Sequence, residues 1–251
     1  MGRRGLPRRR ACVWVSASSR QPRAPAAALD AAGLNVRGVL DAARWDALVP
    51  PAWRTQSLLP GARAAWLLAS GGRALFEAFR RAPESALARD PLDAYTRRVA
   101  AETAAALRRA GKRALPLLAF ERRGGGFADF VALGRAAGLG APSRLGLLLH
   151  PEYGPWLSIR AALLTDLALE PTLEREGFEP CGGCPAPCGA ACPGAAPAPH
   201  GFDVGACREE RAQSPACWLR CAARHACVLG REHAYLAEAE AHHMRHAGTA
   251  P

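Results

Sequence analysis

The sequence contains almost no lysine and no long apolar run. Lys112 is the only lysine, so arginine supplies almost all of the positive charge in a chain of formal net charge +11. No stretch approaches the roughly 20 consecutive apolar residues that a helix needs to cross a bilayer. The apolar run at residues 11–15 is too short for the core of a signal peptide. These absences argue against a membrane span and against export, so we expect a cytoplasmic protein in a reducing compartment.

The arginine excess is concentrated at the N-terminus. Residues 1–29 contain seven arginines and no acidic residue, which leaves +4 (11 − 7) for the rest of the chain. A dedicated nucleic-acid-binding protein gathers its charge on one face, so this diffuse excess argues against a nucleic-acid partner. Because residues 1–28 also lack apolar periodicity, we expect them to form a disordered basic extension.

Between residues 29 and 178, apolar runs alternate with amphipathic segments. The runs predict strands at 64–69, 115–120, 145–149 and 156–164. Between them, the pattern predicts helices at 73–81 and 127–137 and a longer helix with Asp90 as its N-cap and Pro91 at its first position. The sequence therefore predicts an α+β domain in which helices flank a sheet.

From residue 179 the composition changes. Cysteine, glycine, proline and alanine dominate as far as about residue 228, and a last helix is predicted at 232–246. Such a segment has too few large apolar side chains to offset its own conformational entropy with a core. We therefore interpret residues 179–251 as a second module, which must be ordered by something other than a hydrophobic core.

Cysteine thiolates are the candidates for that role. Nine cysteines in a reducing compartment are more typical of metal ligands than of disulfides. A cubane cluster takes four thiolates, so eight cysteines make two complete sets, and the sequence predicts two [4Fe–4S] clusters. Cys12 lies in the extension and is interpreted as a bystander. The eight expected ligands are Cys181, Cys184, Cys188, Cys192, Cys207, Cys217, Cys221 and Cys227.

How these ligands divide between clusters stays open. In two-cluster bacterial ferredoxins, the cysteine that precedes proline at the end of a run ligates the other cluster, and Cys192 precedes Pro193. By that logic Cys227 joins the first three cysteines of the run. However, three residues separate Cys184 from Cys188, where the bacterial run has two.

The cysteines also suit uses other than iron–sulfur clusters. Structural zinc is the main alternative, but it usually takes two close cysteine pairs, and only Cys181 and Cys184 have that spacing. Free thiols or disulfides are a third option. His242 and His246, one helical turn apart, are a weaker metal candidate.

Several segments resemble known families. Residues 137–140 (Ala-Gly-Leu-Gly), 145–157 and 164–171, together with the cysteine run and residues 202–207, resemble epoxyqueuosine reductase and the related reductive dehalogenases. Further upstream, residues 67–70 and 90–95 resemble the cobalamin-processing decyanase family. The resemblance implies a nitroreductase-like mixed sheet flanked by helices, followed by a C-terminal ferredoxin-like two-cluster module. It also implies a cobalamin held over the clusters.

The function implied by this resemblance is that of an oxidoreductase. Electrons from a donor such as a flavodoxin or ferredoxin would pass through the clusters to a bound cobalamin or another small molecule. Residues 122–124 and 141–144 depart from the family pattern at its acidic proton donor and its Trp-x-Gly-Lys-Asn motif, which argues against epoxyqueuosine as the substrate. Two alternatives stay open: a cobalamin-processing or cobalamin-carrying protein without a substrate of its own, and a ferredoxin-like electron carrier. No catalytic or cobalamin-binding residue is assigned.

Overall fold

The computed structural model describes residues 22–246. The first described helix, α1 (Arg23–Ala31), begins inside the segment predicted to be a disordered extension. Three consecutive alanines at residues 26–28 favour a helix, and Leu29 of the same helix is fully buried. The boundary predicted at residue 28 therefore falls within a helix, while residues 1–21 of the predicted extension lie outside the described part of the chain.

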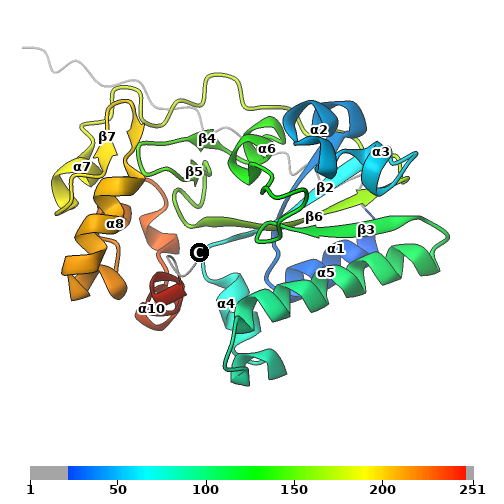
Figure 1. Cartoon of the computed structure of the whole chain (residues 1–251), viewed down its shortest axis with the longest axis horizontal. Coiled ribbons are helices and arrows are strands. Elements are labelled where there is room, and N and C mark those ends of the chain that lie inside the picture. Colours follow the sequence, from blue (N-terminus) through cyan, green and yellow to red (C-terminus); the bar gives the residue numbers. More distant parts are fainter. Residues whose placement is uncertain (1–21, 247–251) are drawn as a thin grey trace, which may run out of the picture.

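A four-stranded sheet forms the centre of the front domain (Figure 1). Its strand order is β1-β2-β6-β3, with β1 (Val36–Asp41), β2 (Ala64–Gly71), β3 (Ala114–Leu118) and β6 (Leu157–Thr165). All three pairings are antiparallel, whereas the resemblance implied a mixed sheet. β2 is buried at all eight positions because it is an inner strand covered on both faces. The predicted α+β class is confirmed.

Helices cover both faces of this sheet (Figure 1). One layer contains α1, α4 (Ala74–Phe79) and α5 (Pro91–Arg109) and packs around Trp66. The other contains α2 (Ala42–Leu48), α3 (Thr55–Leu58) and α6 (Phe130–Ala136), with the short 3-10 turn η2 (Pro51–Trp53), and packs around Trp45 and Trp53. The result is a helix–sheet–helix sandwich with a core on each side of the sheet.

Helix α5 starts at Pro91 as predicted, but its expected cap is wrong. Asp90 has a left-handed backbone (φ 45°), and its side chain makes no capping hydrogen bond. A short 3-10 turn, η3 (Pro83–Ala86), leads toward this helix. By contrast, Asp129 does cap α6, because its carboxylate accepts from the backbone N–H groups of Val131 and Ala132. No helix within residues 22–246 is long and apolar enough to cross a membrane.

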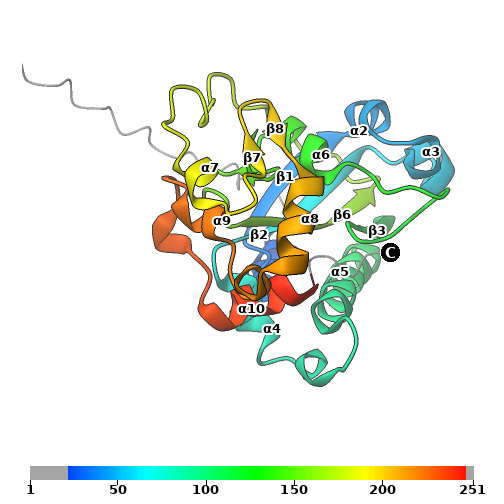
Figure 2. The same ribbon diagram turned by 60° about the vertical axis from the view of Figure 1, so that its left-hand side comes forward.

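The cysteine-rich module lies at one end of the sandwich, and Figure 2 shows it turned toward the viewer. It is built from short elements, as expected for a segment without a core of its own. They are α7 (Pro187–Ala191), β7 (Pro197–Ala198), β8 (Gly201–Phe202), α8 (Val204–Gln213), η4 (Pro215–Trp218), α9 (Ala222–Ala226), η5 (Arg231–His233) and α10 (Ala237–His246).

The module contacts the front domain at the turn between β5 (Leu148–Leu149) and β6. β5 pairs with β4 (Ala141–Pro142) and is much shorter than the predicted strand at 145–149. Beyond it, Gly154 lies against the backbone of Leu229. Arg224 of α9 donates two hydrogen bonds to the carbonyl oxygen of Pro155. The two parts of the chain therefore meet through backbone groups as well as side chains.

A buried histidine lies in the same turn. His150 is fully buried, and its Nδ1 accepts from the backbone N–H groups of Glu152 and Tyr153. Burial, together with the positive charges of Arg175 and His233, lowers the pKa of His150 to about 4 from 6.5. The folded protein therefore keeps this histidine neutral at pH values where the unfolded chain protonates it.

That difference makes stability depend on pH. Above pH 6.5 His150 is neutral in both the folded and the unfolded chain, and the free energy of unfolding is at its full value. As pH falls from 6.5 toward 4, protonation of His150 in the unfolded chain lowers the free energy of unfolding by about 3 kcal/mol at most. We expect His150→Asn, whose side-chain oxygen can accept the same backbone bonds without titrating, to show a shallower loss of stability between about pH 7 and pH 4. Urea unfolding followed by tryptophan fluorescence at several pH values would measure both slopes. Equal slopes would contradict this assignment.

Candidate metal centres

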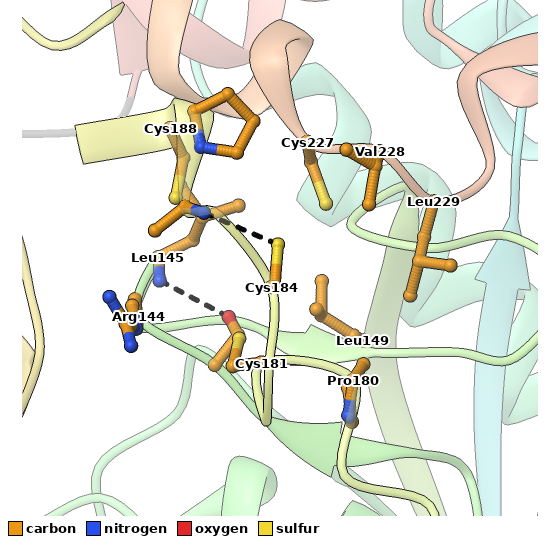
Figure 3. Close-up of a pocket in the computed structure, with 13 residues that line it drawn as sticks. Arg144, Leu145, Leu149, Pro180, Cys181, Cys184, Cys188, Cys227, Val228 and Leu229 are labelled. Carbon is orange, nitrogen blue, oxygen red and sulfur yellow. Dashed lines mark hydrogen bonds between the residues drawn. The ribbon is translucent and has the colours of Figure 1, made fainter. Parts of the chain in front are cut away.

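Four of the predicted ligands surround one pocket. Cys181, Cys184, Cys188 and Cys227 line it and point their sulfur atoms toward the space between them (Figure 3). The space that they surround is small, with a volume of about 20 Å³. The rest of the lining is largely apolar, with Leu145 and Leu149 contributed by the front domain. These four cysteines are called the first set below.

The other four cysteines form a second group, called the second set. Burial raises the pKa of the Cys207 thiol, and the nearby thiols of Cys192 and Cys217 raise it further. Burial also raises the pKa of the Cys221 thiol, with Cys192 and Cys207 adding to the shift. These mutual influences require proximity, so the chain brings Cys192, Cys207, Cys217 and Cys221 together. The same influences operate within the first set. Burial raises the pKa values of the Cys188 and Cys227 thiols, and other thiols of their own set raise them further.

Two short helices link the sets. Cys188 lies in α7 and Cys192 follows it, while Cys221 precedes α9 and Cys227 follows it. The two helices pack against each other, so each carries one cysteine of either set. The five residues of α9 rise ~7.5 Å, so the two sets lie close to each other.

The local sequence explains this wrapping of the chain. Ala186 has a left-handed backbone (φ 53°), which turns the chain back toward Cys184. As a result, the backbone N–H of Ala186 donates to the Cys184 sulfur at 3.4 Å (Figure 3). Hydrogen bonds of this kind stabilise negative charge on sulfur and tune the potential of a bound cluster.

The fit of these residues to a cluster rests on donor chemistry and grouping. Each set supplies four thiols, and the first set encloses unfilled space. Among residues 22–246, no three His, Cys, Asp or Glu side chains stand in the arrangement of a bound metal ion. The raised thiol pKa values mean that iron would have to displace protons on binding, because only thiolates are ligands.

A second and larger cavity lies beside Arg224. Its volume is about 370 Å³, and it lies between the start of α5, the ends of β3 and β6, α9 and α10. Arg160 is held there by Asp93 at 2.5 Å. Arg224 lies over the rings of Trp156 and Tyr235, with its guanidinium carbon 4.5 and 4.6 Å from their centroids. A concave site of this size with convergent polar groups suits a small molecule.

Sequence reasoning missed several residues that the structure brings to the site. Arg224 lies between Cys221 and Cys227 along α9, so the sequence alone could have predicted that it lies close to both sets. Arg160 carried no such signal, since only the packing of β6 brings it to the larger cavity. His242 lines the larger cavity and contacts the rings of Phe76 and Phe79, and its pairing with His246 in a metal site stays a prediction.

Comparisons with known proteins point to one fold. An epoxyqueuosine reductase solved with an epoxyqueuosine-modified tRNA-Tyr stem loop superposes with a TM-score of 0.58 at 16% identity, over 87% of this chain and 68% of that one. The enzyme from Bacillus subtilis gives 0.58 at 16% identity, over 86% and 66%. A B12-dependent reductive dehalogenase gives 0.48 at 19% identity, over 84% and 33%. No protein-family model and no curated protein matches the sequence.

The likeness to the two epoxyqueuosine reductases shows the fold. The chain has the fold of epoxyqueuosine reductases, which confirms at the level of structure the resemblance found in the sequence. It spans about two thirds of the length of those reductases.

Proposed function

We propose that this protein is an iron–sulfur oxidoreductase that carries electrons through two [4Fe–4S] clusters, one on each cysteine set. The observation that carries the proposal is the grouping of the eight cysteines into two fours, with the first set around unfilled space. The fold shared with epoxyqueuosine reductases supports the reductase class. Residues 29–178 and 179–251 are proposed to act as the acceptor-binding domain and the cluster module.

In this proposal the protein supplies ligands, burial and orientation, while the clusters supply single-electron chemistry. The pocket of the first set is lined by Leu145, Leu149 and Val228, which limits the access of water to the cluster. Arg224 connects the second set with the larger cavity, because it lines that cavity and its positive charge acts on the Cys221 thiol. An acceptor bound there would receive electrons from the module.

Cobalamin is the acceptor that the sequence resemblance implies, and its fit differs from that of the clusters. The cavity beside Arg160 and Arg224 has a volume of about 370 Å³, within the range of pockets for drug-sized ligands. A corrin ring with its nucleotide tail is far larger than such a ligand, so the residues present do not enclose a whole cobalamin. We therefore assign the cavity to a smaller organic acceptor.

One structural neighbour was solved with a tRNA stem loop, which is a property of that protein. For this chain, the absence of a nucleic-acid partner stays a prediction. The electron donor is proposed to be a flavodoxin or a ferredoxin.

Iron and sulfide analysis tests the proposal. Protein purified without oxygen is expected to contain about eight iron and eight acid-labile sulfide per chain and to show a broad absorbance near ~400 nm that bleaches on reduction. Stoichiometric zinc without labile sulfide would refute the clusters. A bound cobalamin, detected by its visible spectrum after extraction, would refute the smaller acceptor.

A further inference from the structure

A buried carboxylate on the last helix contacts the second cysteine set. Glu240 of α10 is only 3% exposed. One of its oxygens accepts from the backbone N–H of Cys221 at 3.0 Å, and the other lies 2.6 Å from Nε2 of His225. Burying a carboxylate is costly unless hydrogen bonds or charge compensate it. Here one oxygen accepts a hydrogen bond from a predicted cluster ligand, and the other contacts a histidine on the helix that follows that ligand.

The same helix contacts the second set at other points. Arg211 of α8, one turn after Cys207, donates to the backbone oxygen of Met244 at 2.6 Å. η4, which contains Cys217, packs against α10. Three of the four cysteines in the second set therefore lie on segments that α10 supports.

Its position on the helix distinguishes Glu240 from its neighbour Glu238. The carboxylate of Glu238 is 64% exposed and lies 3.8 Å from Arg80, in a surface ion pair, and such pairs contribute little to stability. Glu240 instead closes a connection between residues far apart in sequence, since its bonds reach back 15 and 19 residues. Loss of that connection frees the start of α9 and with it Cys221.

We propose that Glu240 is a positioning residue that fixes Cys221 for the second cluster, so that α10 is required for that cluster and not for the first. This inference rests on the proposed function. The backbone N–H of Cys221 is oriented by the Glu240 carboxylate, and the His225 ring is held by the same side chain against Trp156, 4.9 Å between ring centroids. The Cys221 sulfur is thereby held at the position that closes the second set.

Replacement of Glu240 tests this role. Glu240→Ala is expected to lose about half of the iron of the parent protein, and reduced protein should show the paramagnetic signal of one cluster without its interaction with a second. Glu240→Gln keeps an oxygen for Cys221 and an N–H for His225, so it should restore the iron and both signals. Glu238→Ala, on the exposed side of the same helix, is the matched control and should equal the parent.

The outcomes separate the inference from the proposed function. Full iron and both signals in Glu240→Ala would overturn the role of Glu240 alone, as would loss of both clusters from a protein whose front domain stays protease-resistant. A parent protein without iron would overturn the proposed function and this inference with it. If the alanine variant is insoluble, Glu240→Asp, whose shorter side chain reaches less far, should lower only the second cluster's signal. An unchanged signal would contradict the inference.

Discussion

Cys184→Ala and Cys192→Ala are each expected to lose iron and to make residues 179–228 sensitive to protease, while the front domain stays resistant. The module contains few large buried side chains. Its buried cluster consists of Leu145, Cys188 and Ala223, and the first of these belongs to the front domain. Metal–thiolate bonds must therefore supply most of its order. Each proposed cluster also closes long loops, whose entropy the segment could not otherwise offset.

The grouping of the cysteines makes this expectation more specific. Cys184 belongs to the first set and Cys192 to the second, so each variant should remove mainly its own cluster. Limited proteolysis with fragment masses, alongside iron and sulfide counts, would measure both effects. Cys12→Ala is the control, since that cysteine stands outside both sets in the sequence. Variants that resist protease as well as the parent would show that the clusters do not order the module.

The sequence was most informative where local pattern determines structure. β2 and the second half of β6 were predicted because they are buried inner segments of the sheet and have the continuous apolar sequence that such burial requires. β1 was missed, since Val36–Asp41 mixes Arg37, Gly38 and Asp41 with its apolar residues. It is a strand because its residues pair with β2 from Val36↔Ala69 to Asp41↔Ala64. That pairing is a tertiary fact that no local window contains.

The candidate site shows the same division. The cysteines are predicted as ligands from their number and spacing, because ligand type is a local property of the sequence. The contact of Glu240 with Cys221 depends instead on how α10 packs against α9. In the sequence, Glu238 and Glu240 stand in the same Ala-Glu-Ala-Glu-Ala repeat, and only the fold exposes one and buries the other.

The joint between the front domain and the module contains two glycines whose backbones touch the opposite segment. Gly154 has φ +54°, and a Cβ there would lie 2.7 Å from the carbonyl carbon of Leu229 and nearer still to its oxygen. Gly230 has φ +59°, and its Cβ would lie 2.6 Å from the backbone nitrogen of Gly154. These are backbone atoms, which cannot move aside as a flexible side chain does. Leu229 comes two residues after Cys227, so a shift here reaches the first set.

Gly154→Ala is therefore expected to separate the module from the front domain and to lower the iron content. Gly125→Ala is the matched control, since Gly125 also has a left-handed backbone (φ +83°) but nothing within 4 Å of its Cβ position. The control should cost only the ~1–2 kcal/mol of left-handed strain, whereas Gly154→Ala adds a collision to the same strain and should cost clearly more. Urea unfolding would measure the loss of stability, and hydrogen exchange of residues 181–233 would measure the separation of the module. An iron count would measure the loss of iron. Equal losses in both variants would mean that backbone strain alone acts at Gly154, and that the close approach to Leu229 does not hold the module in place.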